Sequence, residues 1–462
     1  MASTDSEISA TLDVAKAAKS AFEASQLLSA DVRKLALGKI AGRLESNKAA
    51  ILAANGEDMQ AAQVEVDAGR MSNALLKRLD LSRGDKWDAM VKGVRDVANF
   101  PDPTGIVTYA TELDDDLELY RVTCPIGVLL IIFEARPEVV VNIAALAIKS
   151  GNAAILKGGK ESTRTTLLLS RVISEGLAQA TLPSTYIQSI QTRAEVSALL
   201  ALDQYIDLVI PRGGNSLVRN IQNSTRIPVM GHADGLCHVY LDESADPEKA
   251  VRIVLDSKVD YPSACNAAET LIVHMSLLHT VWPKVAKALL DADVHLLCDS
   301  HTLATLDTSQ FPQEKLESHV SVASESSYDI EHLDLKFSVI ALPSLHSAIQ
   351  FINAHSSHHT DSIVTESQEA ATTFCRGVDS AGTFINASTR FADGFRYGFG
   401  TEVGISTGRI HARGPVGLEG LVIYKYMMRS KADKGHVVGE FGVGEGKRSY
   451  KHAPIKTTIV PF

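Results

Sequence analysis

The sequence predicts an α/β protein with two domains, each built around a parallel sheet. The chain has 462 residues, more than one hydrophobic core usually serves, so two or more domains are expected. From residue 127 onward, short apolar segments alternate with amphipathic helical segments. This alternation indicates right-handed βαβ crossovers and parallel strands. The pattern restarts near residue 238, where the first α/β domain is expected to meet the second.

Helices are expected over residues 7–70, at the start of the chain. Apolar residues recur there at roughly helical intervals between Leu35 and Leu44, and Asn55-Gly56 is expected to stop the helix. The section that follows is less regular, and residues 118–127 (ELYRVTCPIG) have the composition of a strand.

The two α/β domains follow in order along the chain. The strands expected in the first domain are 127–133, 153–158, 186–192 and 207–214. Its helices are 138–151, 163–180 and 194–202. The strands expected in the second domain are 236–242, 270–274, 294–299, 337–343, 362–367 and 383–388. Its helices are 246–259, 279–292, 345–354 and 369–377. Residues 420–428 and the tail 456–462 also have the composition of strands.

The composition favours small-molecule chemistry in a reducing compartment. There are 45 basic and 55 acidic residues, so the net charge of −10 gives no electrostatic footprint for nucleic acid or an anionic membrane. The five cysteines are scattered and contain no CxxC pair, which indicates neither a disulfide framework nor a zinc cluster. The start lacks the features of a secretory signal, and charges interrupt the most apolar stretch. We expect a soluble, cytoplasmic protein.

Cys265 is the strongest candidate for a nucleophile. It lies in DYPSACNAAE (260–269), a loop between a helix ending near Val259 and an apolar strand, among small residues that would let a substrate approach. A free cysteine is more often a small buried hydrophobe than a nucleophile. The other four cysteines lie in or beside apolar strand and helix patterns, where packing is the better interpretation. If any cysteine is a nucleophile, it is therefore Cys265.

A cysteine nucleophile on an α/β frame suggests thioester chemistry. The thiolate attacks an activated acyl group while backbone N–H groups hold the oxyanion. Cysteine protease chemistry is the alternative, but its local sequence signatures are absent. A hydrolase is therefore the second choice.

Two arginines follow apolar segments directly. Arg136 and Arg390 both stand at the expected ends of strands, where ligands of parallel sheets bind. A lone arginine is usually a surface charge, but one at such an end is suited to bind a carboxylate or phosphate bidentately. The pair suits a doubly anionic substrate.

Lysines and glycines at two other strand ends are candidates for cofactor binding. Lys157 and Lys160 in LKGGKES would meet ribose hydroxyls or phosphate, or else be solvated. Gly213 and Gly214 precede a helix, and would let a dinucleotide phosphate approach its N-terminus. The full GxGxxG pattern is missing, and a bare Gly-Gly turn is common.

The segment NAHSSHHTD places His355, His358 and His359 close together. His355 and His359 are four residues apart, a spacing found in metal sites. The two serines between them indicate a helix end, and no HExxH glutamate is present. We expect no metal site.

Four segments resemble the gamma-glutamyl phosphate reductase family, also called glutamate-5-semialdehyde dehydrogenases, in the aldehyde dehydrogenase superfamily. The segments are residues 125–162, 260–273, 348–365 and 386–421, and the resemblance covers nearly the whole chain. It implies NADPH-dependent reduction of L-glutamate 5-phosphate to L-glutamate 5-semialdehyde, with release of phosphate, in proline biosynthesis. Glutamate 5-kinase, a separate polypeptide, is then a candidate partner.

The resemblance also implies an aldehyde-dehydrogenase-like architecture. A Rossmann-like NADP-binding domain would comprise residues 1–104 and 126–237, and a catalytic domain residues 238–400. A small β flap and C-terminal segment, through which subunits associate, would comprise residues 105–125 and 401–462. A homo-oligomer is therefore expected.

Individual residues fall at functional positions of the superfamily. Cys265 falls at the place of the nucleophile, and backbone N–H groups near it, with Asn266 nearby, are expected to stabilise the oxyanion. Lys157 falls where a lysine holds the adenosine ribose, and Glu331 where a glutamate holds the nicotinamide ribose. Lys160 replaces an acid of NAD-using relatives, which suits the 2′-phosphate of NADP.

Two departures from general aldehyde dehydrogenases bear on the reaction. Arg136 stands where those enzymes have an oxyanion-hole asparagine, and His232 stands where they have the glutamate that activates water. A reductase must pass hydride to the thioester before water reaches it. A hydrolytic aldehyde dehydrogenase acting on a small acidic aldehyde, and a catalytically inactive scaffold protein, are the alternatives.

Overall fold

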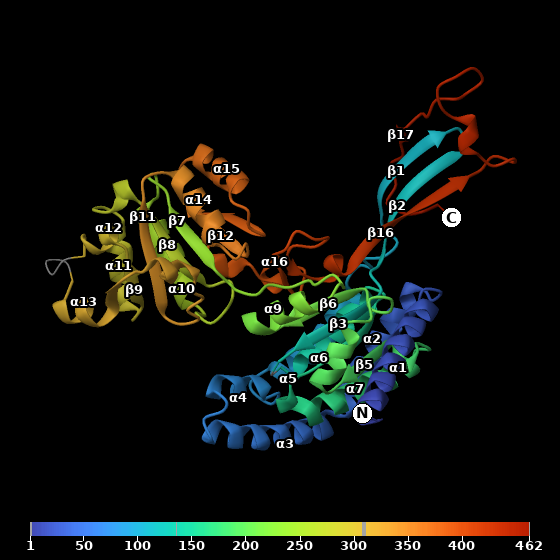
Figure 1. The fold of residues 1–462 in the computed structure, drawn as a ribbon, viewed down its shortest axis with the longest axis horizontal. Helices are drawn as coiled ribbons and strands as arrows, with labels where there is room; N and C mark the ends of the chain where they lie inside the picture. The colour runs from blue at the N-terminus through green and yellow to red at the C-terminus, as the bar shows by residue number, and fades with distance from the viewer. Residues whose placement is uncertain (1, 135, 307–310, 462) are drawn as a thin grey trace.

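The first sheet of the molecule has four parallel strands with helices around it (Figure 1). The computed structural model describes residues 2–134, 136–306 and 311–461. The order is β5-β4-β3-β6, formed by β3 (Val128–Phe133), β4 (Ala153–Lys157), β5 (Ile187–Ile190) and β6 (Leu208–Arg212). The helices are α1 (Ala2–Ser25), α2 (Ala30–Ser46), α3 (Lys48–Asp67), α4 (Asn73–Leu79), α5 (Lys86–Asn99), α6 (Glu138–Lys149), α7 (Thr163–Ala178), α8 (Arg193–Leu199) and α9 (Asn215–Ser224). Every residue of β3 is buried, as its unbroken apolar run requires.

The second sheet has seven strands, all parallel, in the order β10-β9-β11-β8-β7-β12-β13. The strands are β7 (Cys237–Leu241), β8 (Ala268–His274), β9 (His295–Cys298), β10 (Val320–Val322), β11 (Lys336–Leu342), β12 (Thr360–Val364) and β13 (Gly382–Ile385). The helices are α10 (Pro247–Val259), α11 (Trp282–Asp291), α12 (Ser300–Leu303), α13 (Gln313–His319), α14 (Leu345–His355) and α15 (Gln368–Gly377). Separate hydrophobic clusters fill the two faces of this sheet.

A third sheet is antiparallel and projects away from the other two (Figure 1). It has the order β16-β2-β1-β17, with β1 (Val107–Asp114), β2 (Leu117–Pro125), β16 (Val422–Ser430) and β17 (Ala453–Pro454). The short helix α16 (Gly394–Tyr397) and the pair β14 (Gly404–Ser406) and β15 (Gly414–Val416) precede β16. Strands far apart in the sequence thus share one small sheet.

The predicted fold class, with two parallel sheets and a small β flap, is confirmed. The exact domain boundaries stay a proposal, although the change from the first to the second sheet falls between β6 and β7. No helix in the described part of the chain has the length and apolar character needed to cross a membrane.

Two local predictions were wrong. Helix α3 continues through Asn55-Gly56, because the Asn55 side chain donates to Leu79 O at 2.9 Å and accepts from Leu81 N at 2.9 Å, which satisfies the end of α4. The tail forms no strand over the described residues 456–461, and the last strand is the short β17.

A buried ion pair connects α10, β8 and the segment before β11. The Nζ of Lys258 lies 2.6 Å from Oε2 of Glu269, and both side chains are almost fully buried. The other oxygen of Glu269 accepts a hydrogen bond from Leu333 N at 3.1 Å. Burial lowers the pKa of Lys258 and raises that of Glu269, so each group needs the other to stay charged. The pair thereby fixes the segment that carries Glu331.

Lys258→Ala should lower the free energy of unfolding by about 3–5 kcal/mol, because it leaves the Glu269 carboxyl buried without its partner. Lys287→Ala is the matched control, since Lys287 forms an exposed pair with Asp291 on α11. Loss of an exposed pair should change stability by less than about 1 kcal/mol. The midpoints of thermal and urea unfolding measure both effects, and equal midpoints for the two variants would contradict the structural role of Lys258.

Candidate active site

The candidate site lies where two parallel sheets face each other. Cys265, His359 and Gly235 lie just before the amino ends of β8, β12 and β7, which are neighbours in the seven-stranded sheet. Glu134 and Arg212 lie at the carboxyl ends of β3 and β6 in the four-stranded sheet. A cavity of about 440 Å³ is lined from both sides. The site is therefore assembled by the meeting of the two sheets.

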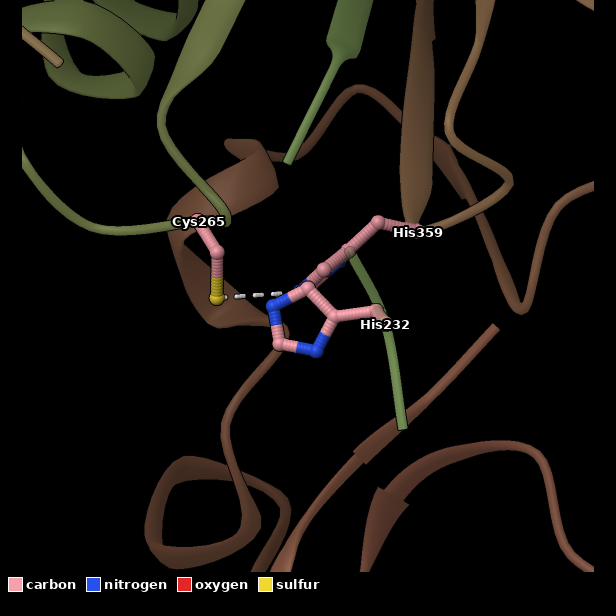
Figure 2. A group of neighbouring side chains, drawn as sticks. All are labelled: His232, Cys265 and His359. Carbon is pink, nitrogen blue, oxygen red and sulfur yellow. Dashed lines mark hydrogen bonds between the residues drawn. The ribbon is translucent and has the colours of Figure 1, made fainter. Parts of the chain in front are cut away.

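The Cys265 thiol is in contact with a histidine. Its Sγ lies 3.3 Å from Nε2 of His359, and Figure 2 shows the His232 ring beside this pair. Burial raises the pKa of the thiol to about 12, and the carboxyls of Glu331 and Glu402 act in the same direction. The nearby Arg212 guanidinium opposes them.

Both neighbouring histidines are neutral. Burial, and secondarily the closeness of His232, lowers the pKa of His359 to about 3, and burial also lowers the pKa of His232. Burial thus acts against transfer of the thiol proton to His359 from both sides, because it disfavours the thiolate and the imidazolium alike. The resting pair is therefore a thiol and an imidazole, without a thiolate.

The backbone of the Cys265 loop is held by close contacts. A Cβ placed on Gly235 would lie 2.2 Å from the carbonyl oxygen of Cys265 and 2.5 Å from its Cα, so only glycine fits. The Cys237 thiol donates to the same carbonyl at 3.3 Å. Within the described chain, the backbone N–H groups of Cys265 and Asn266 donate to no other residue. They are free to bind an oxyanion.

The Asn266 side chain, unlike its backbone N–H group, is fully engaged in hydrogen bonds within the protein. Its Nδ2 donates to Ala392 O at 3.0 Å and to Arg390 O at 3.4 Å, and its Oδ1 accepts from Nη1 of Arg390. The side chain is buried and its polar atoms are engaged. It therefore ties the nucleophile loop to the segment after β13.

Four arginines line the cavity around Cys265: Arg78, which contacts Tyr261, and the three described next, Arg136, Arg390 and Arg212. The guanidinium of Arg136 has no ion pair or hydrogen bond among the described residues. Arg390 is buried, and its Nε donates to Asp260 at 3.1 Å. Arg212 donates to Val403 O at 2.9 Å, and burial lowers its pKa. Arg136 is thus the most available of the three for an anion.

Four carboxyls line this cavity: Glu134, Asp393, Glu331 and Glu402, of which the last two are described here. Oε1 of Glu331 accepts from Gly235 N at 3.0 Å, and Oε2 of Glu402 accepts from Gly394 N at 3.0 Å. Burial raises the pKa of both groups. Each carboxyl therefore keeps one oxygen fixed by the backbone.

A second cavity, of about 370 Å³, lies beside the first and is lined by one of the predicted cofactor residues, Lys157. The two cavities share Phe133 and Glu134 as lining residues. Lys157 lines the second cavity, and burial lowers its pKa; it forms no ion pair or hydrogen bond with the residues the structure describes. Lys160 is exposed on the next turn and does not line this cavity.

The two predicted glycines lie between the cavities. A Cβ on Gly213 would meet Leu217 at 2.7 Å and Glu134 at 3.0 Å, whereas Gly214 has open space around its Cα. Both line the larger cavity, and Gly214 precedes the N-terminus of α9. The unpaired, half-buried Lys157 and the small residues Gly213 and Gly214 before α9 are suited to bind a dinucleotide.

His359 and Arg212 were missed as site residues by the sequence reasoning. His359 was weighed only with His355 and His358, which in the structure bind Asp329 and Asp379 O instead. The order of the strands, which brings β12 beside β7, had no sequence signal. Arg212 did have one, because it ends an apolar strand in the same way as Arg136.

A family model, curated relatives and a solved structure all place this chain in the same protein family. The model of the aldehyde dehydrogenase family matches residues 2–332. A probable gamma-glutamyl phosphate reductase of Schizosaccharomyces pombe is 52% identical over 440 residues, 95% of this chain and 96% of the relative. The gamma-glutamyl phosphate reductase of Saccharomyces cerevisiae is 47% identical over 466 residues, 98% of this chain and 100% of the relative. The crystal structure of gamma-glutamyl phosphate reductase from Thermotoga maritima has a TM-score of 0.85 at 34% identity, and covers 92% of this chain and 99% of that one.

Gly235→Ala should reduce turnover by about 100-fold or more while leaving the chain folded, because the new methyl group displaces the Cys265 backbone. Gly38→Ala is the control, since Gly38 lies in α2 with open space around it. Steady-state kinetics and circular dichroism measure turnover and folding. Equal turnover in the two variants would show that the close contact does not position the nucleophile.

Proposed function

Because the chain belongs to the aldehyde dehydrogenase family and, within it, to the gamma-glutamyl phosphate reductases, we propose that its reaction runs through a thioester on Cys265. The chain reduces L-glutamate 5-phosphate to L-glutamate 5-semialdehyde and releases phosphate, a step of proline biosynthesis. The single observation that carries the mechanism is the contact of the Cys265 thiol with His359 in a cavity lined by arginines.

The first step is attack of the Cys265 sulfur on the γ-carbonyl carbon. A carbon–sulfur bond forms, and the carbon–oxygen bond to phosphate breaks. Nε2 of His359 lies 3.3 Å from the sulfur and accepts the thiol proton as the new bond forms. Because a resting thiolate is so costly, proton transfer and attack proceed together, and the proton passes on to the departing phosphate.

The charge that develops on the carbonyl oxygen is held by backbone donors. The free N–H groups of Cys265 and Asn266 form the oxyanion hole. The Asn266 side chain acts through Arg390, by keeping the loop in place. Asn266 thus supports the oxyanion hole in two ways.

A nicotinamide cofactor supplies the hydride that reduces the thioester. Lys157 is suited to hold the adenosine ribose, and Gly213 and Gly214 to let the pyrophosphate pass. Glu331 lines the cavity of the nucleophile, where it is suited to hold the nicotinamide ribose. Lys160, exposed beside this site, favours NADPH through the 2′-phosphate.

A hydrolytic aldehyde dehydrogenase would need a carboxylate base aimed at water. Glu331, Glu402 and Asp393 line the cavity, but each already accepts a backbone hydrogen bond, and Glu134 lines it from the carboxyl end of β3. His232, at the place of that base, donates its Nδ1 proton to Ile405 O at 3.3 Å. A histidine held in this way, in place of a carboxylate, favours the reductase over the hydrolytic enzyme.

The reaction run backwards tests the proposal, because the acyl phosphate is labile. With glutamate semialdehyde and NADP, formation of NADPH should require phosphate, and should fall at least about 10⁴-fold in Cys265→Ala. The same assay with NAD measures the cofactor preference. Turnover without phosphate would identify a hydrolytic enzyme, and no turnover would favour a scaffold protein.

Arg136 and Arg390 should give different kinetic defects. Arg136→Ala should raise the KM for phosphate or the semialdehyde about 10- to 100-fold with little change in melting temperature, since one charge-assisted contact is lost. Arg390→Ala should mainly lower kcat and the melting temperature, because it frees the Asn266 loop. Unchanged kinetics in either variant would remove that arginine from the site.

We also propose that subunits associate through β16. This strand lies at the edge of its sheet, and Ile423, Tyr424, Tyr426 and Met428 are exposed along it. An exposed apolar edge strand is a common site of pairing.

We place the protein in the cytoplasm, because its five free cysteines fit a reducing compartment. A kinase in the same compartment must supply the acyl phosphate.

The double change Tyr426→Lys and Met428→Lys should dissociate the oligomer, because two charges enter its apolar edge. Sedimentation equilibrium should then report the chain mass of 49.6 kDa, and a multiple of it for the wild type. Val443→Lys, at a fully exposed position outside the strand, is the control. A wild type that sediments as a single chain would contradict the interface.

A further inference from the structure

Cys265, His232 and His359 form a set of three metal-ligand groups. Their ligand atoms all lie within 4.8 Å of one another, and the two rings are nearly perpendicular, with centroids 5.5 Å apart. With the bond lengths usual for zinc, neighbouring ligand atoms of a tetrahedral site are about 3.3–3.6 Å apart. The Sγ–Nε2 distance of 3.3 Å between Cys265 and His359 already has this value. A small rotation of His232 brings in the third ligand (Figure 2).

The other ring nitrogen of each histidine has a partner that leaves Nε2 available. Nδ1 of His232 lies 3.3 Å from Ile405 O, a carbonyl that only accepts, so this nitrogen carries the proton. Nδ1 of His359 lies 2.9 Å from the hydroxyl of Thr360. Zinc-binding histidines are oriented by such outer hydrogen bonds. The lone pair of His232 is therefore on Nε2, and the Thr360 hydroxyl, by donating to Nδ1 or accepting from it, can serve either tautomer of His359.

We propose that Cys265, His232 and His359 bind Zn²⁺ reversibly, and that the bound metal inhibits the enzyme. The zinc–sulfur bond replaces the sulfur–hydrogen bond, one proton passes to solvent, and no electrons are transferred. The fourth position opens into the cavity of Arg136, where water or an anion completes the tetrahedron. One thiolate and two imidazoles favour zinc over magnesium or calcium, which take oxygen ligands.

The binding of zinc and the inhibition of the enzyme by zinc rest on different observations. Binding follows from the three ligand groups alone. Inhibition rests on the proposed function, because it requires Cys265 to be the nucleophile that the metal occupies. In the sequence His359 could be weighed for metal only with its neighbours His355 and His358, because positions 232, 265 and 359 come together only in the fold.

Cobalt titration of the full chain, first freed of metal with a chelator, tests the binding without using activity. Co²⁺ should bind with one equivalent per chain and give the near-ultraviolet band of a cobalt thiolate, and Zn²⁺ should displace it. Cys265→Ser should abolish the band, and His232→Asn should weaken Zn²⁺ binding more than about 10-fold. Circular dichroism verifies that each variant is folded, and His232→Gln repeats the test if His232→Asn is not.

Two control variants should bind Co²⁺ and Zn²⁺ as the wild type does. Cys375→Ser removes a half-buried thiol on α15, and His355→Asn removes a histidine paired with Asp329. Absence of binding, or a thiolate band that persists in Cys265→Ser, would overturn the site. If metal binds as described but zinc leaves turnover unchanged, inhibition is overturned. If metal binds and the wild type shows no turnover at all, the zinc site stands and the proposed function fails.

Discussion

The placement of the Cys265 thiol against the neutral His359, in a partly buried cavity, is the constraint on which the site depends. Burial keeps the thiol protonated at rest, with a pKa of about 12, and keeps His359 neutral beside it. Such a pair is inactive until an electrophile arrives, so activation must come with the substrate. An acyl phosphate suits this arrangement, because it brings an activated carbonyl and a leaving group that takes up a proton. The arginines around the cavity supply the positive charge that such a substrate requires.

The site arises from the way the two sheets meet. Cys265 and His359 come from the amino ends of one parallel sheet, and Lys157, Gly213 and Gly214, proposed to bind the cofactor, come from the carboxyl ends of the other. The close contact of Gly235 with the Cys265 backbone and the tie between Asn266 and Arg390 then fix the nucleophile loop. The buried pair of Lys258 and Glu269 fixes the opposite wall.

Much of the fold could be predicted from local patterns, because apolar strands and amphipathic helices have strong periodicity. Cys265 could be chosen because its loop context differs from that of the other cysteines. The side chains that contact Cys265 could not be predicted, because the order of the strands decides that His359 lies beside it. The same limit explains Asn55, whose expected helix stop was overridden by hydrogen bonds to a segment more than twenty residues away. Arg390 was predicted to bind a carboxylate or phosphate of the substrate, and the sequence could not show that its guanidinium also donates to Asp260 and Asn266.

The burial of the thiol also determines how the protein withstands oxidants. Peroxides attack the thiolate, and a cysteine with an ordinary pKa is about 3% thiolate at pH 7. Burial raises the pKa of Cys265 to about 12, so its thiolate fraction at pH 7 is well below that of an exposed cysteine. The burial that keeps the Cys265 thiol protonated until substrate binds therefore also protects it from overoxidation between turnovers. That protection exists only in the folded chain, because strands β7, β8 and β12 must pair before the thiol is covered.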